Sequence, residues 1–245
     1  MRTIRLHADV PMTVGAELTL PAQPSEHAAR VLRLGAGDPL TLFNGDGCDY
    51  QAIICAIAKR TVSVRITAQQ SLQNESRLPL VLAQGMARGD KMDWIVQKAT
   101  ELGAVGIVPL LTERSEVRLD GPRALKRVAH WQSVAISACE QSGRARIPSI
   151  QPIQPLADWL AELSDHGALR LVLLPQAAAT IRELHFAQAG GVLVIGPEGG
   201  LGDADLRALE QHGFVGLRLG PRILRTETGG LAALSALQAC HGDLQ

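Results

Sequence analysis

LGPRILRTETGGLAAL, residues 219–234, is the stretch that decides the fold of this chain. It begins at the end of a short apolar run, passes through Gly220 and Pro221 into a polar loop, and ends in an Ala- and Leu-rich segment that favours a helix. The same plan occurs upstream, where VLVI at 192–195 leads into GPEGG at 196–200 and a helix is predicted to begin near Asp203. Two such units in succession predict a parallel sheet with both loops at one edge. Ligands bind at that edge in open α/β sheets.

The chain upstream of these units follows the same alternation as far back as residue 73. Strands are predicted at 80–83, 105–111 and 171–174, and helices at 93–102 and 122–141. In the shorter helix, Trp94, Ile95, Ala99 and Leu102 fall on one face. Strands that alternate with helices indicate a parallel sheet with helices on both faces.

Residues 1–72 have a different character. Short β-prone runs lie at 18–20, 40–43, 50–57 and 62–66, and the turn sequence NGDG at 44–47 predicts a hairpin. One helix is predicted among them, capped by Ser25, with Val31 and Leu32 on its apolar side. Short strands with tight turns suggest a small barrel. The polar segment 69–77 fits a linker, so we predict domains at 1–72 and 73–245.

Composition excludes several classes of protein. The chain is 46% hydrophobic and 20% charged, which is typical of a soluble globular protein, and its 3% of aromatic residues argues against stacking platforms for single-stranded bases. Its four cysteines are far apart and form no CxxC pair, which favours reduced thiols in the cytoplasm over a zinc site. No signal peptide or membrane span is evident. We therefore expect a cytoplasmic protein without a metal and without a membrane partner.

Charge is distributed unevenly along the chain. Residues 1–150 carry 18 basic and 14 acidic side chains, whereas residues 151–245 carry 6 and 10. The positive excess in the first part could meet a polyanion, although ordinary scatter of surface charge explains the same count equally well.

The loop GPEGG at 196–200 predicts a narrow slot of bare backbone with one carboxylate at its edge. Glycine allows close approach of a ligand to the main chain, and proline stiffens the turn. The chain contains neither G-x-x-x-x-G-K-[ST] nor G-x-G-x-x-G, so a triphosphate or a dinucleotide is a poor fit. A planar base with a thioether chain suits such a slot better.

The loop at 219–228 adds charged groups to the same edge. Arg225 offers five donors in a fixed fork, suited to phosphates or to the carbonyls of a base, and Glu227 could hold it or accept a proton. The alternative is a surface pair of Arg225 and Glu227, with Thr228 capping the last helix. The second loop beside it favours the functional interpretation.

These motifs resemble those of the SPOUT methyltransferases, and most closely the bacterial family that methylates N3 of a uridine in small-subunit (16S) ribosomal RNA. The resemblance spans nearly the whole chain and includes HAARVLRL at 27–34, KMDWIVQKATELG at 91–103, TERSEV at 112–117 and ACEQSGRARIP at 138–148. It implies a PUA-like β-barrel followed by an α/β domain with a C-terminal trefoil knot, S-adenosylmethionine as cofactor, and a homodimer. Gly229-Gly230 departs from the family pattern and suggests a looser start of the last helix.

We hypothesise that Arg225 donates to a uracil carbonyl and stabilises the developing anion, and that Glu198 or Glu227 orients it or relays the proton. The resemblance implies the residues of the cofactor slot, which are Leu174, Pro175, Gly196, Pro197, Glu198, Gly199, Gly200, Leu219, Gly220, Ile223 and Leu224.

Six basic residues are candidates for contacts to RNA phosphates: Arg5, Arg30, Arg33, Lys91, Arg114 and Arg144. The substrate would be ribosomal RNA or an assembled 30S subunit, and the sequence leaves that choice open. Two alternatives to the main interpretation remain, a non-catalytic RNA- or ribosome-binding protein with this fold, and a SPOUT enzyme that acts on a different nucleotide. A hydrolase is disfavoured because neither G-x-S-x-G nor H-E-x-x-H occurs.

Overall fold

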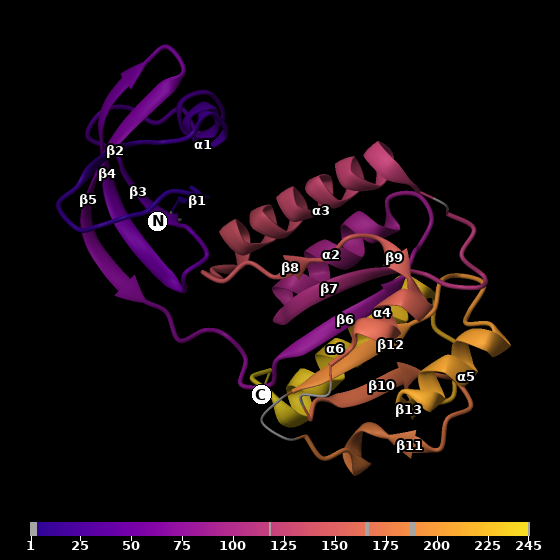
Figure 1. The fold of residues 1–245 in the computed structure, drawn as a ribbon. Helices are drawn as coiled ribbons and strands as arrows, with labels where there is room; N and C mark the ends of the chain where they lie inside the picture. Colours follow the sequence, from indigo (N-terminus) through magenta and orange to yellow (C-terminus); the bar gives the residue numbers. More distant parts are fainter. Residues whose placement is uncertain (1–3, 118, 165–166, 187–189, 245) are drawn as a thin grey trace. The chain divides into compact units, whose positions relative to one another are not determined.

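The computed structural model describes residues 4–117, 119–164, 167–186 and 190–244. The chain divides into two compact units (Figure 1). One comprises residues 1–75 together with 139–147, and the other comprises 76–138 together with 148–245. The segment 139–147, expected in the second domain, belongs to the first unit because its Cys139 and Ala145 are buried with Phe43.

The first unit is built on a five-stranded sheet with the order β1-β3-β4-β5-β2. β1 runs parallel to β3, and the remaining pairs are antiparallel. Two register shifts within the β4–β5 pair bend the sheet around its core. Side chains of β5 alternate between the core and the outside of the sheet: Val62, Val64 and Ile66 are all fully buried. The strands are β1 (Arg5–His7), β2 (Glu17–Thr19), β3 (Pro39–Phe43), β4 (Cys48–Ala58) and β5 (Thr61–Ser71).

The predicted hairpin at 44–47 joins β3 to β4, but the predicted helix differs from expectation. α1 (Ala22–Glu26) begins before Ser25 and continues into the π-helical turn η1 (His27–Val31). Ser25 is buried rather than capping: its hydroxyl donates to Leu20 O at 2.9 Å and accepts the Val62 N–H at 3.2 Å. Val31, expected on the apolar side, is 68% exposed. The π-helical turn breaks the 3.6-residue period on which that expectation depended.

The second unit is an α/β sandwich around a parallel sheet with the order β11-β13-β10-β12-β6-β7-β8, in which β9 also pairs with β7. Every pair in it is parallel. The strands are β6 (Leu80–Gly85), β7 (Ala104–Leu111), β8 (Ser149–Ile150), β9 (Gln154–Pro155), β10 (Leu169–Leu173), β11 (Ala179–Thr180), β12 (Gly191–Ile195) and β13 (Val215–Arg218).

Helices cover both faces of this sheet, as predicted (Figure 1). α2 packs with α6, and α4 packs with α5 on the other face. β12 is buried along its whole length, as expected of a strand covered on both sides. The helices are α2 (Lys91–Glu101), α3 (Gly121–Ser142), α4 (Leu156–Glu162), α5 (Asp203–Gln211) and α6 (Thr226–His241), with the 3₁₀ turn η2 (Ile181–Glu183).

One detail of α2 was predicted wrongly. Trp94 is 45% exposed, whereas Met92, Ile95, Val96 and Ala99 form the buried face. In the part of the chain that the structure describes, no helix is long and apolar enough to cross a membrane.

The two motif strands, β12 and β13, are separated in the sheet by β10. Three loops therefore leave the same edge: residues 174–178 after β10, 196–202 after β12 and 219–225 after β13. The prediction that both Gly/Pro loops lie at one edge is confirmed, and β10 adds a third loop between them.

Candidate functional site

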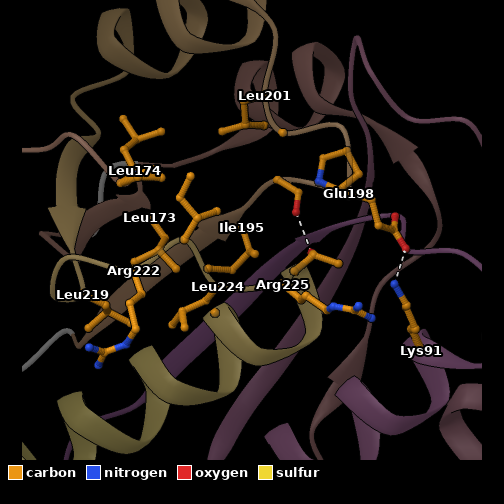
Figure 2. Close-up of a pocket in the computed structure, with 17 residues that line it drawn as sticks. Lys91, Leu173, Leu174, Ile195, Glu198, Leu201, Leu219, Arg222, Leu224 and Arg225 are labelled. Atoms are coloured by element: carbon orange, nitrogen blue, oxygen red, sulfur yellow. Dashed lines mark hydrogen bonds and ion pairs between the residues drawn. The ribbon is translucent and has the colours of Figure 1, made fainter.

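The three loops enclose a cavity of about 590 Å³ at the carboxyl edge of the sheet (Figure 2). This volume lies within the range of roughly 300–1,000 Å³ typical of small-molecule sites. Its wall is mostly aliphatic, with bare main chain from the GPEGG loop and charged groups on two sides. Arg222 and Leu219 lie on one side of the cavity in Figure 2, and Arg225, Lys91 and Glu198 lie on the other.

Nine of the eleven predicted cofactor residues line this cavity. The two exceptions lie within the same loops: Gly220 faces a neighbouring groove, and the Gly199 carbonyl accepts a hydrogen bond from Arg114 Nη1 at 3.3 Å. The role of all eleven residues in cofactor binding stays a prediction. The nine are Leu174, Pro175, Gly196, Pro197, Glu198, Gly200, Leu219, Ile223 and Leu224.

Six further lining residues were not predicted as cofactor residues. Leu173 and Ile195 end strands and Leu201 follows the GPEGG loop, whereas the other three lie within the motif at 219–234, where the sequence alone does not show which side chains face the cavity. The six are Leu173, Ile195, Leu201, Arg222, Thr226 and Gly229. Thr226 joins three segments of the chain. Its hydroxyl donates to Gly196 O at 2.6 Å and accepts from Gln84 Nε2 at 2.8 Å. The start of α6 is thereby fixed to the end of β12 and to β6.

We expect Thr226→Val to lower the free energy of unfolding by about 1–3 kcal/mol, because it leaves the buried Gln84 amide without this acceptor. Denaturant unfolding measures the loss. Thr228→Val, at an exposed position two residues away, is the control and should change stability by less than about 0.5 kcal/mol. Equal stability of the two variants would contradict the role given to Thr226.

Gly229 and Gly230 give α6 a tight contact with the sheet rather than a loose start. Both are buried inside a continuous helix. A Cβ at Gly229 would lie 3.0 Å from Leu173 Cδ2, and one at Gly230 would lie 3.3 Å from Ile195 Cγ1. The expectation of a looser helix is therefore wrong: the two glycines let the helix backbone approach β10 and β12.

The two predicted catalytic carboxylates both face Lys91, the first residue of α2. Lys91 Nζ donates to Glu198 Oε1 at 2.9 Å and lies 3.4 Å from Glu227 Oε2. Burial acts to raise the pKa of Glu198, but hydrogen bonds from Lys91 Nζ and from the backbone N–H of Arg88 outweigh it, so that this pKa lies below its usual value. The same bond to Glu198 raises the pKa of Lys91. We conclude that Lys91, nominated for RNA phosphates, holds the two carboxylates of the site.

Arg225 is placed differently. It is exposed, and within the described ranges neither a hydrogen bond nor an ion pair joins its guanidinium to Glu198, to Glu227 or to another side chain. The expected pairing of Arg225 with a carboxylate is absent because Lys91 takes both acids. The guanidinium is therefore available at the cavity for a ligand.

Two of the residues nominated for RNA are buried in the first unit. The Arg5 side chain is 9% exposed and is paired with Asp49 at 2.6 Å, and the Arg144 side chain is 6% exposed and is paired with Glu75 at 2.6 Å. Arg5 also donates to Cys139 O at 2.7 Å and stacks over Phe43. Buried and paired guanidiniums do not reach a phosphate, so we no longer assign Arg5 and Arg144 to the RNA-binding surface.

The remaining nominees are exposed. Arg30 pairs with Glu26 one turn earlier, at 2.7 Å, and Arg33 has a left-handed backbone with φ of 55° after the π-helical turn. Arg114 reaches the GPEGG loop through its bond to Gly199, as described above. Its neighbour Glu113 accepts the Ala204 N–H at 3.2 Å and so caps α5. The TERSEV segment thus supports the loop from outside.

No cluster of three or more His, Cys, Asp or Glu side chains that could hold a metal ion occurs among the residues that the structure describes. The four cysteines are free thiols. Burial raises the pKa of the Cys139 thiol to about 11, which keeps it protonated at neutral pH.

Comparison with known proteins identifies the family. A profile described as RNA methyltransferase domain matches residues 74–238, and one described as RNA methyltransferase PUA domain matches residues 21–67. The chain is 32% identical over 243 residues to ribosomal RNA small subunit methyltransferase E of Buchnera aphidicola, covering 99% of this chain and 98% of that protein. This chain belongs to the ribosomal RNA small subunit methyltransferase E family.

Two solved structures of high similarity hold S-adenosylmethionine. The family member from Neisseria gonorrhoeae is 36% identical with a TM-score of 0.93, and a methyltransferase from Legionella pneumophila is 40% identical with a TM-score of 0.95. Each comparison covers all of both chains. The predicted fold class, a PUA-like domain followed by an α/β trefoil-knot domain of the SPOUT class, is confirmed.

Proposed function

We propose that this protein transfers a methyl group from S-adenosylmethionine to N3 of a uridine in small-subunit ribosomal RNA. The observation that carries the proposal is the cavity formed by the loops after β10, β12 and β13, with the unpaired guanidinium of Arg225 at its side. Its fit to the methyl donor rests on aliphatic walls for a base and a thioether, and on the exposed main chain around Gly200, which has a φ of 71°. Membership of the family supports the substrate.

S-adenosylmethionine would supply an activated methyl group, so the protein has to align the acceptor and exclude water. N3 of uridine carries a proton and becomes a nucleophile only when that proton leaves. Arg225 donates to a uracil carbonyl and stabilises the anion that forms. Because the pKa of Glu198 is held low, this carboxylate is ionised but weakly basic, and it relays the proton to solvent. Arg225 makes the larger contribution to the rate by stabilising the uracil anion.

Lys91 acts on this mechanism as a positioning residue. By bonding Glu198 and facing Glu227, it keeps both acids away from Arg225, whose charge then stays available to the uracil. Without Lys91, one of the two carboxylates would be free to neutralise Arg225.

We therefore expect Lys91→Gln to lower kcat on the order of 10²-fold, the scale on which misplacement of a catalytic group acts. Lys91→Arg, which keeps a cation between the acids, should retain most of the activity. Steady-state kinetics at several salt concentrations checks both variants. If Lys91 bound phosphate instead, Lys91→Gln would flatten the salt dependence of RNA binding and raise KM while leaving kcat in place.

The proposed activity is tested in two steps. Calorimetry with S-adenosylmethionine and its demethylated product should show binding of both; failure of both to bind would favour a non-catalytic RNA-binding protein. Mass spectrometry of ribosomal RNA from a deletion strain, before and after complementation, should show a 3-methyluridine that depends on this gene. A methyl group restored on a different nucleotide would assign the enzyme another target.

We also infer a cytoplasmic homodimer, from the resemblance of the chain to the SPOUT class. Sedimentation of the purified protein tests the dimer. Methylation of naked RNA compared with assembled 30S subunits decides which of the two is the substrate.

A further inference from the structure

A second hollow, of about 840 Å³, adjoins the cofactor cavity in the second unit. We name it the arginine groove. It lies between η2, the loop after β13 and one face of α6. Leu219, Arg222 and Leu224 line both hollows, so the groove and the cavity are adjacent. Its lining is Thr180, Ile181, Arg182, Arg218, Leu219, Gly220, Pro221, Arg222, Leu224, Thr228, Ala232 and Ala236.

Three arginines line this groove outside any ion pair of the described residues. Arg182, Arg218 and Arg222 are exposed, and across the described ranges the structure gives none of them a hydrogen bond or an ion pair. The lining contains no Asp or Glu. The nearby Glu183 accepts the Thr180 N–H at 2.8 Å and the Thr180 hydroxyl at 2.9 Å. These bonds and the charge of Arg218 lower the pKa of Glu183, so this one carboxylate outside the lining compensates part of the charge of Arg218.

The positive charge of this groove does not follow from a basic composition of the surrounding sequence. Residues 151–245 carry six arginines, no lysine and ten acids, yet half of those arginines meet in one groove. Six arginines outside this part of the chain form ion pairs, as Arg5 does with Asp49. Three neighbouring like charges repel one another, and a bound polyanion relieves that repulsion.

The other walls of the groove indicate how such a polyanion lies. Thr228, Ala232 and Ala236 follow one another at four-residue spacing on α6 and present small side chains. The lining includes no aromatic residue on which a base could stack. Guanidiniums beside a helix face with small side chains suit contacts to phosphates and sugars rather than to base edges.

We infer that the arginine groove seats the sugar-phosphate backbone of the ribosomal RNA strand that flanks the target uridine. This inference rests on the proposed function and adds to it the path of the substrate. Arg222 lines both hollows on the side of the cavity opposite Arg225 (Figure 2), so a strand seated in the groove reaches the rim of the cavity and continues across it to the nucleotide at Arg225. Two of the four arginines predicted for RNA in the first unit, Arg5 and Arg144, are buried, whereas these three are exposed.

The test compares Arg182→Gln/Arg218→Gln with wild type and with Arg207→Gln, an exposed arginine of α5 outside both hollows. Binding to a ribosomal RNA fragment is measured over a range of salt concentrations. Each lost phosphate contact to a single strand should flatten the slope of log K against log salt by about 0.7, so the double variant should lose roughly 1.4. KM for RNA should rise, while kcat and the affinity for S-adenosylmethionine stay at the wild-type level.

A salt slope of the double variant equal to that of wild type and Arg207→Gln would overturn the inference. If the sedimentation of the double variant changed as well, the groove would be a contact between two copies of the chain. Binding is measured without turnover, so its outcome is distinct from failure of the proposed function, which would appear as wild-type protein that binds RNA but transfers no methyl group.

Discussion

Replacing Arg225 with alanine is expected to lower kcat for RNA methylation by about 10²–10³-fold, the usual loss when one stabilising donor of a developing anion is removed. The affinity for S-adenosylmethionine should stay at the wild-type level, because the aliphatic and main-chain walls of the cavity remain in place. The loss follows from the position of Arg225, whose guanidinium lies at the cavity with no acid to neutralise it. Single-turnover kinetics with calorimetry of the methyl donor measures the two quantities separately.

Two further variants make this result specific. Arg225→Lys keeps the positive charge but loses the planar fork of donors, so its rate should fall between those of wild type and alanine. Arg207→Ala, on α5, removes an exposed arginine away from the cavity and should leave the rate unchanged. Full turnover by Arg225→Ala would refute the assignment of Arg225. A loss of affinity for S-adenosylmethionine would mean that Arg225 binds the cofactor rather than the uracil.

The general plan of the second unit could be predicted from sequence, because each part of it has a local cause. β12 reads as an unbroken apolar run, and a Gly/Pro loop follows at once, so strand, loop and edge follow from adjacent residues. The same holds for the hairpin at 44–47, where turn chemistry fixes the connection between β3 and β4. Most of the cofactor wall then follows, because parallel strands deliver their loops to one edge.

Pairings between distant residues could not be predicted in this way. Lys91 and Glu198 are separated by 107 positions, and nothing in either motif indicates that they meet. Arg5 and Arg144 look like surface charges in the sequence, and only the fold shows that Asp49 and Glu75 take them. The same is true of the arginine groove, whose three arginines come from η2, β13 and the loop after it. The sequence shows which residues are charged, but the partner of each charge depends on how distant segments fold together.

Gly196→Ala should weaken binding of the methyl donor rather than slow the chemical step. A Cβ at Gly196 would lie 3.0 Å from the Gly200 carbonyl carbon and 3.1 Å from Leu201 N, so it would press on the backbone of its own loop. Overpacking of this kind costs about 1–3 kcal/mol, which corresponds to roughly a 5- to 150-fold loss of affinity if the loop bears it. The Gly196 carbonyl also accepts the Thr226 hydroxyl, so a shift of the loop would disturb the start of α6. Calorimetry with S-adenosylmethionine measures the affinity.

A matched control separates this local effect on the loop from a general loss of stability caused by an added methyl group. Gly35→Ala adds the same group in the first unit, where the nearest atom would be Asp38 Oδ2 at 3.7 Å, and it should leave donor affinity unchanged. Thermal unfolding of both variants shows whether Gly196→Ala remains folded. A folded Gly196→Ala protein with wild-type affinity would mean that the donor binds away from the GPEGG loop. Together with Arg225→Ala, this variant divides the site into two parts: the loop after β12 holds the donor, and the residue before α6 acts on the acceptor.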